Sequence, residues 1–295
     1  MKLLITLALL TTTSFAGTIL PNIKWNQIEA NNTGAAAAWG DRSNVTLHGD
    51  RSSVTDAWNF GAQVLASYAG AAIEAGVIAG PDGVDNQIYD LNLGYVVMPN
   101  LSIGLELNYH NLDAPLPDLS RPSLSVGYKL SHGIVLGAGF GRQHINGLSV
   151  DSNQIHAGVG YMTENSTDEL VLKYALEDED TATGAIFNSA WEVEFEHVCH
   201  NMVAKGLQMA AVANVGKVDG GDTQWSVQPE LEYMAATHFF PGVFGGYSDA
   251  GGTADGTWNA GLSLRNAYHN MQWLAKAGWT EGDNYQFDID LSYMF

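Results

Sequence analysis

The chain of 295 residues carries 32 acidic and 12 basic side chains, and its formal net charge of −20 argues against binding to nucleic acid, whose phosphates would repel it. Charged residues make up only 15% of the chain and hydrophobic residues 46%, which excludes a disordered acidic segment. The 33 glycines, 8 tryptophans and 12 tyrosines favour a protein rich in β-structure.

Residues 1–16 have the features of a secretory signal peptide. Lys2 precedes an apolar stretch that ends at Leu10, and the small residues Ser14 and Ala16 stand at the −3 and −1 positions of a cleavage site. The apolar stretch is too short to cross a bilayer as a helix, and an uncleaved anchor is the alternative. The sequence therefore predicts an exported protein whose mature chain begins near Gly17.

Residues 17–57 form an N-terminal extension that we interpret as a candidate lumenal plug. Two near-copies, WGDRSNVTL and HGDRSSVTD, follow one another at residues 39–47 and 48–56. In each copy the aspartate can cap a turn while the arginine reaches acidic groups of a lumen. The plug candidates are Asp41, Arg42, Asp50 and Arg51. A local duplication in a periplasmic extension is the alternative.

Apolar and polar side chains alternate from about residue 87 to the end of the chain. In the first such segment, Tyr89 and Leu91 stand on one face of an extended strand and Asp90 stands on the other. Each segment has roughly the ten residues that a tilted strand needs to cross a membrane. We assign Phe240 and Phe244 to the same apolar face as the other large side chains.

Short turns alternate with long polar connections along this part of the chain. MPN and SHG are short, whereas NLDAPLPDLSRP and EDEDTATGAIFNS are long. This alternation is typical of a transmembrane antiparallel β-barrel with short periplasmic turns and longer extracellular loops. A soluble β-sandwich is the alternative, but the number of segments and the aromatic residues near strand ends favour the barrel. Residues 58–295 are therefore predicted to form an all-β transmembrane barrel.

The expected number of strands depends on the stretch WNFGAQVLASYAGAAIEAGVIAG at residues 58–80. Bacterial single-chain barrels have an even number of strands. One long strand in this stretch gives a barrel of 14 strands, which is the count that we prefer. A hairpin here requires another strand from the preceding residues and gives 16.

The chain ends in FDIDLSYMF, an alternating strand that closes on an aromatic residue. This ending resembles the assembly signal of Gram-negative outer-membrane β-barrels, and the matching positions are Phe287, Ile289, Leu291, Tyr293 and Phe295. The resemblance implies a cell outer membrane location and recognition by periplasmic chaperones and the barrel-assembly machinery. It also implies contact with outer-membrane lipids and lipopolysaccharide.

Two groups of such barrels are similar to this chain in different ways. Porins resemble it in their polar lumen and long outer loops. The long-chain fatty-acid transporter family resembles it in having an N-terminal segment before the barrel that plugs the lumen, although the chain lacks that family's Asn-Pro-Ala signature. The subfamily stays open at this point.

If the large apolar residues face lipid, the alternate positions face the lumen. The predicted pore-lining residues are Asp90, Glu106, Lys129, Lys173, Glu192, Glu194, Glu196, Glu230, Glu232, Arg265, Lys276, Asp288 and Asp290. Acids outnumber bases in this set, and an acidic lumen attracts cations. The sharpest feature is EVEFE at residues 192–196, which is either a stripe that attracts cations or a solvated wall whose carboxylates pair with a base such as Lys173.

The sequence carries no signature of catalysis, of a cofactor or of a metal centre. No phosphate loop, nucleophile elbow or metal-binding motif is present. Cys199 is the single cysteine, so no internal disulfide can form, and its neighbours His197 and His200 cannot all converge with it on one ion in an extended chain. We therefore expect a protein that is not an enzyme and that binds no cofactor or metal.

Taken together, these features predict a porin-like channel for passive diffusion of small polar solutes, with some preference for cations. A plugged barrel that transports hydrophobic molecules is one alternative. A sealed barrel with a structural or surface role is another. The sequence leaves the solute undetermined, and a homo-oligomer is compatible with it.

Overall fold

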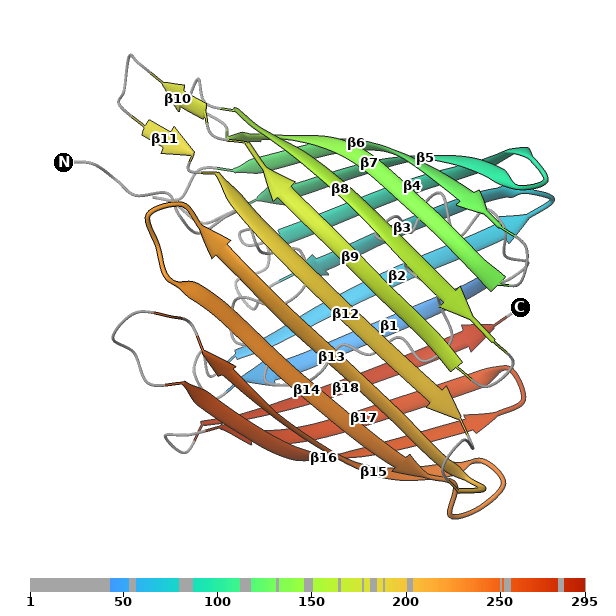
Figure 1. Ribbon diagram of the computed structural model, residues 1–295. Coiled ribbons are helices and arrows are strands. Elements are labelled where there is room, and N and C mark those ends of the chain that lie inside the picture. The colour runs from blue at the N-terminus through green and yellow to red at the C-terminus, as the bar shows by residue number, and fades with distance from the viewer. Residues whose placement is uncertain are drawn as a thin grey trace.

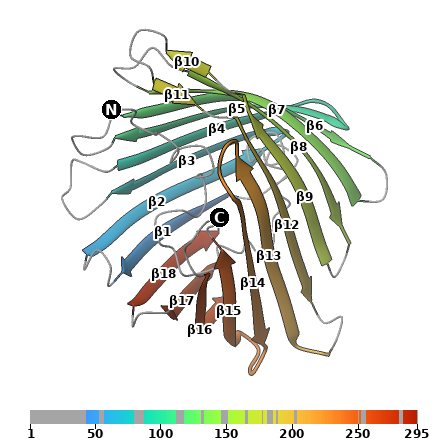
Figure 2. The same cartoon turned by 60° about the vertical axis from the view of Figure 1, so that its left-hand side comes forward.

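The protein is a closed antiparallel β-barrel of sixteen strands (Figure 1). The computed structural model describes residues 43–294 except 53–56, 80–86, 112–117, 131–132, 146–150, 164–165, 177, 181–184, 188, 201–203, 250, 252–255 and 281–283. Each wall strand pairs with its neighbours in sequence, and β1 pairs with β18 to close the sheet. A small separate hairpin, β10–β11, projects beyond the wall strands (Figures 1 and 2).

The strands are 9 to 12 residues long in the wall and three residues long in the hairpin. Their bounds are β1 Ser43–Ser52, β2 Ala57–Tyr68, β3 Ala71–Ala79, β4 Gln87–Met98, β5 Leu101–Asn111, β6 Leu119–Lys129, β7 Ile134–Ile145, β8 Asp151–Met162, β9 Ser166–Ala175, β10 Asp178–Asp180, β11 Ala185–Phe187, β12 Ala190–His200, β13 Leu207–Val218, β14 Thr223–Tyr233, β15 Phe239–Asp249, β16 Thr257–Tyr268, β17 Met271–Thr280 and β18 Asn284–Met294. In the described residues, no helix is long and apolar enough to span a membrane.

The preferred count of 14 strands is wrong, and the alternative of 16 is confirmed. Residues 58–80 do not form one strand, because the chain turns at Ala69 and Gly70 between β2 and β3. Both turn residues have positive φ, 51° for Ala69 and 82° for Gly70. Alanine seldom adopts such a backbone, so this turn carries little signal in the sequence.

The barrel also begins earlier than predicted. The predicted boundary at residue 58 is wrong, because β1 forms a full wall strand between β2 and β18. Asp50 and Arg51 therefore lie in the wall and not in a plug. Asp41 and Arg42, together with the predicted signal peptide, lie outside the described residues.

The wall has one apolar face and one polar face. Large apolar side chains are exposed at alternate positions, as with Leu124 at 63% and Ile103 at 49%. In the register they meet across strands, for example Leu93 with Leu105. Exposed aliphatic rows on the outside of a closed barrel require an apolar surrounding, and the buried polar side chains between them point inward. The expected alternation is therefore present in the wall.

The two-residue connections all lie at one end of the wall strands, and the longest connection lies at the other end. Two residues join β2 to β3, β4 to β5 and β16 to β17. The connection from β9 to β12 is much longer and carries the β10–β11 hairpin. β18 ends at the rim of the short turns, where Met294 lies opposite Asn44 (Figure 1).

Glycines in β15 and β16 leave space that neighbouring inward side chains and backbone fill. A Cβ on Gly242 would stand 2.4 Å from Oγ of Ser263 and 2.7 Å from the carbonyl oxygen of Leu231. A Cβ on Gly261 would stand 2.1 Å from Cζ of Phe244, whose ring occupies that space. The absence of side chains at these two positions makes room for the buried charges of β14, β16 and β17.

We therefore expect Gly242→Ala to lower the free energy of unfolding by about 1 to 3 kcal/mol, because the added methyl group overpacks a filled region. Denaturant unfolding of the detergent-solubilised barrel, followed by tryptophan fluorescence, measures the change. Gly245→Ala in the same strand is the control, since its Cβ would meet only the carbonyl oxygen of Asn259, at 3.6 Å. Equal stability of the two variants would contradict this packing.

Candidate functional site

The candidate site is the inward face of the barrel, which we call the lumenal wall. Residues opposite the exposed apolar rows form it, and acidic side chains outnumber basic ones on the described strands. The predicted pore-lining residues Asp90, Glu106, Lys129, Lys173, Glu192, Glu194, Glu196, Glu230, Glu232, Arg265, Lys276, Asp288 and Asp290 all fall on inward positions of these strands. Lys129 is the last residue of β6 and is exposed at the rim.

The EVEFE segment of β12 is paired, in part, with a lysine. Lys173 on β9 places its Nζ 3.3 Å from Oε1 of Glu192 and 3.3 Å from Oε2 of Glu194. Glu196 lies opposite Glu169 in the register of the same two strands. One ammonium thus bridges two of the three carboxylates.

A second polar ladder runs across β4, β5 and β6. Arg121 donates to Glu106 at 3.2 Å and to the side-chain oxygen of Asn108 at 2.7 Å. Asn108 in turn donates to Asp90, and Ser123 donates to Glu106 at 3.0 Å. Arg121 was absent from the predicted set because it was assigned to the long connection NLDAPLPDLSRP, whereas β6 already begins at Leu119. It supplies the positive charge that this part of the wall needs.

The third group is deeply buried and crosses β14, β15, β16 and β17. Lys276 donates to Glu230 at 2.8 Å, and Arg265 donates to Glu232 at 2.9 and 2.6 Å. Both glutamate side chains have at most 1% of their surface exposed. We call these four residues the buried ion-pair cluster. Charges desolvated to this degree must be paired, because an isolated one is very unfavourable.

The assignment of Phe240 and Phe244 to the lipid face is wrong. Both are buried on the inward side of β15. The Arg265 guanidinium lies 4.2 Å from the ring centre of Phe240, and the Lys276 ammonium lies 5.9 Å from that of Phe244. These rings cover the buried ion-pair cluster and strengthen it through cation–π contacts. The facing of β15 was predicted wrongly because Phe239 and Phe240 are adjacent, so either one could be assigned to the outward face.

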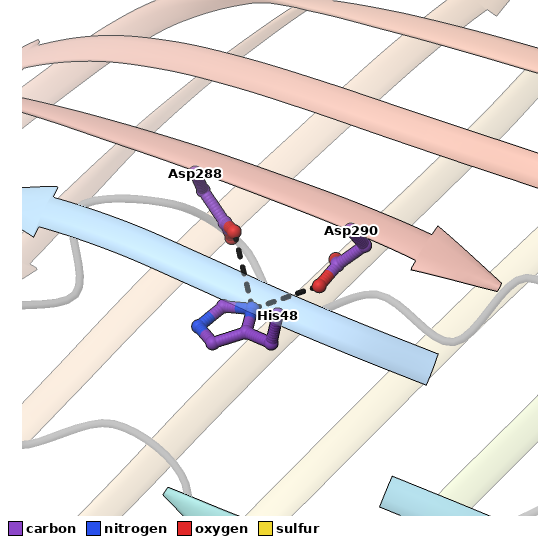
Figure 3. Close-up of side chains that lie close together, drawn as sticks. All are labelled: His48, Asp288 and Asp290. Atoms are coloured by element: carbon purple, nitrogen blue, oxygen red, sulfur yellow. Dashed lines mark hydrogen bonds and ion pairs between the residues drawn. The ribbon is translucent and has the colours of Figure 1, made fainter. Parts of the chain in front are cut away.

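A fourth group joins the first and last strands (Figure 3). His48 on β1 places Nδ1 at 2.7 Å from Asp290 and 3.3 Å from Asp288, both on β18. Its Nε2 lies 3.1 Å from Asp50, which also accepts a hydrogen bond of 2.9 Å from Asn59. Asp288 and Asp290 were expected at the wall, but His48 was missed because its strand was assigned to the extension.

The predicted assembly residues form the outward face of β18. Ile289, Leu291 and Tyr293 are exposed, and Phe287 lies in edge contact with Trp58. Arg51, a predicted plug residue, stands opposite Phe287 and Trp58 in the register and therefore points outward with them. Phe295 lies outside the described residues.

Three further titratable or nucleophilic side chains, His144, His197 and Cys199, lie outside these four groups. His144 and Arg142 contact Asp151 on the outward face near the long connections. Cys199 is buried and is not in a disulfide. His197 binds Asp168 at 2.6 Å. Among described residues, the one group of three or more His, Cys, Asp or Glu side chains close enough to share an ion is His48 with Asp288 and Asp290.

No protein-family model matches this chain, and no curated protein matches it by sequence. Among solved structures, the barrel is similar to CdiB from Acinetobacter baumannii, with a TM-score of 0.61 and 10% identity over 86% of this chain and 60% of CdiB. It is similar to Pseudomonas aeruginosa OccD3, with a TM-score of 0.54 and 10% identity over 90% of this chain and 93% of OccD3. It is also similar to a bacterial polysaccharide outer membrane secretin, with a TM-score of 0.54 and 13% identity over 86% of this chain and 99% of that one.

These likenesses establish the architecture. The chain spans less than two thirds of the length of CdiB and nearly the whole length of the other two. The chain has the fold of those proteins.

Lys276→Met tests the buried ion-pair cluster. It leaves the Glu230 carboxylate buried without its ammonium partner, and we expect the free energy of unfolding to fall by about 3 to 5 kcal/mol. Denaturant unfolding in detergent measures the loss. The double variant Lys276→Met/Glu230→Gln removes both charges and should recover much of the stability. If the Lys276→Met variant were as stable as the original chain, the Lys276–Glu230 pair would contribute nothing to stability.

Proposed function

We propose that this protein is an outer-membrane channel that passes small polar solutes by diffusion and prefers cations. The observation that carries the proposal is the acidic lumenal wall inside a closed barrel with an apolar outer face. The apolar face fits a bilayer, and the polar face fits water. Similarity to OccD3, a porin-sized barrel covered over 93% of its length, supports the same assignment.

The charge distribution supports a preference for cations. Carboxylates on the wall outnumber lysine and arginine even after Lys173, Arg121, Arg265 and Lys276 are paired. In a narrow aqueous path with low-dielectric walls, such an excess concentrates cations and repels anions. Diffusion requires no catalytic group.

The two sides of the lumenal wall differ in how much they contact solvent. Side chains of the buried ion-pair cluster are at most 7% exposed, whereas those of Glu106 and Lys173 are 20% and 27% exposed. The solute path is therefore expected along β5, β6, β9 and β12. Packing on one side is expected to narrow the lumen, which would favour small solutes.

The same packed side favours one alternative, a barrel closed to ions. Glu230, Glu232, Arg265 and Lys276 are buried as in a protein core, and such packing is also expected in a plugged or sealed barrel. Recording from the purified protein in a planar bilayer separates the two. Steady conductance with cation selectivity supports the channel. A correctly folded but silent barrel contradicts it and favours transport of hydrophobic molecules or a structural role.

Selectivity is expected to depend on the EVEFE segment. A unit charge about 8 Å from an ion in water changes the energy of that ion by about 0.5 kcal/mol, or about twofold in local concentration. Replacing Glu192, Glu194 and Glu196 together with glutamine should therefore lower the cation-to-anion permeability ratio severalfold. The reversal potential in a potassium chloride gradient measures this ratio.

The matched control changes the opposite charge. Lys173→Met removes the ammonium that bridges Glu192 and Glu194, so it should raise the permeability ratio for cations. The two variants are thus expected to move the reversal potential in opposite directions. Movement in the same direction, or no movement in either variant, would count against an electrostatic role for this part of the wall.

A further inference from the structure

The barrel seam between β1 and β18 contains a convergent set of metal-ligand atoms. Nδ1 of His48 lies 2.7 Å from Oδ1 of Asp290 and 3.3 Å from Oδ1 of Asp288 (Figure 3). The three candidate ligand atoms lie within 4.8 Å of one another. Ligands bound to one ion at about 2.1 Å stand about 3.0 to 3.4 Å apart, in octahedral or tetrahedral geometry. The two distances from Nδ1 are close to that range.

The single hydrogen atom that Nδ1 of His48 can carry cannot form hydrogen bonds to both Asp288 and Asp290. A single N–H at Nδ1 can point at one carboxylate, and Asp290 is the nearer acceptor. Oδ1 of Asp288 is buried and has no hydrogen-bond partner, although it faces the same nitrogen. A divalent cation between the three atoms would bind all of them at once and would neutralise the two adjacent carboxylates.

The other side of the imidazole has the support that metal-binding histidines use. Nε2 of His48 lies 3.1 Å from Oδ2 of Asp50, and Asn59 holds the other oxygen of Asp50 at 2.9 Å. A carboxylate on the distal nitrogen fixes the ring orientation and raises the basicity of the nitrogen that binds the ion. Asp50 is therefore a positioning residue and not a ligand.

We propose that His48, Asp288 and Asp290 form a binding site for a divalent transition-metal ion of the zinc type, on the lumenal wall across the β1–β18 seam. One imidazole nitrogen and two carboxylate oxygens suit zinc and its neighbours better than calcium or magnesium, which take oxygen ligands. The ion links the first strand of the barrel to the last. This role is separate from solute diffusion and adds a cross-link where the sheet closes.

The experiment uses the full-length protein, folded in detergent without a histidine tag and stripped with a chelator. Titration with zinc, followed by isothermal calorimetry, should show one ion per barrel. Zinc should also raise the melting temperature, because it binds the folded seam. Cobalt in place of zinc should give the visible absorption bands of a nitrogen- and oxygen-ligated ion.

Variants separate this site from adventitious binding. His48→Asn and the double variant Asp288→Asn/Asp290→Asn should abolish the zinc-dependent rise in melting temperature, whereas Asp50→Asn should weaken zinc binding about 10- to 100-fold. His144→Asn is the matched control, because His144 also binds an aspartate, at 2.7 Å, but lies outside this group. It should bind zinc as the original chain does.

Heat-modifiable migration on gels checks that each variant is folded. If a ligand variant does not fold, the cobalt spectrum and zinc stoichiometry of the original chain decide the question. Failure of the folded original chain to bind zinc would overturn the proposal. So would unchanged binding in a folded His48→Asn variant, or tighter binding of calcium or magnesium than of zinc.

Discussion

The structure depends on closing the sheet. A β-sheet with an apolar outer face would otherwise leave two edge strands with unpaired backbone groups in an apolar surrounding. In hydrocarbon no water is available to backbone N–H and C=O groups, and each unpaired group is unfavourable by several kcal/mol. The pairing of Asn44–Ser52 with Gln286–Met294 satisfies those groups on both edges at once. Closure also links the tilt of the strands to their number and stagger.

Closure also forces charges together on the inside. Neighbouring strands place inward side chains about 5 Å apart, so an acidic wall needs bases or shared protons to be stable. The protein meets this need in separate ways on its two sides. Lys173 and Arg121 each contact two or more polar groups on the more exposed side, whereas Lys276 and Arg265 form buried pairs under Phe244 and Phe240. The result is a wall with one hydrated side and one packed side.

Most of the fold prediction came from the two-residue alternation of apolar and polar side chains. The alternation from residue 87 onward specifies strands and faces, because a step of one residue would move every apolar side chain to the wrong side. It failed where neighbouring residues are both apolar, as at Phe239 and Phe240, and where a turn uses Ala69 and carries no proline or asparagine. It also missed β1, whose residues SNVTLHGDRS carry few large apolar side chains. The pairing of Lys173 with Glu192 and Glu194 was one of the two alternatives read from the sequence. The pairing of Lys276 with Glu230 could not be read from it, since the two residues are 46 residues apart and on strands that are not neighbours.

The seam has a consequence for how the chain folds. Thr46 and Ser292 hydrogen-bond across it at 2.9 Å, yet they are separated by 246 residues. Every other wall contact joins strands that follow closely in the chain, so hairpins can form in order, but the last contact must wait for the last strand. Bringing such distant segments together costs conformational entropy before the stabilising contacts between them form. This cost makes the closing step slow. Until then both edges are exposed to pairing with other chains, and this interval is when the protein is most prone to aggregate.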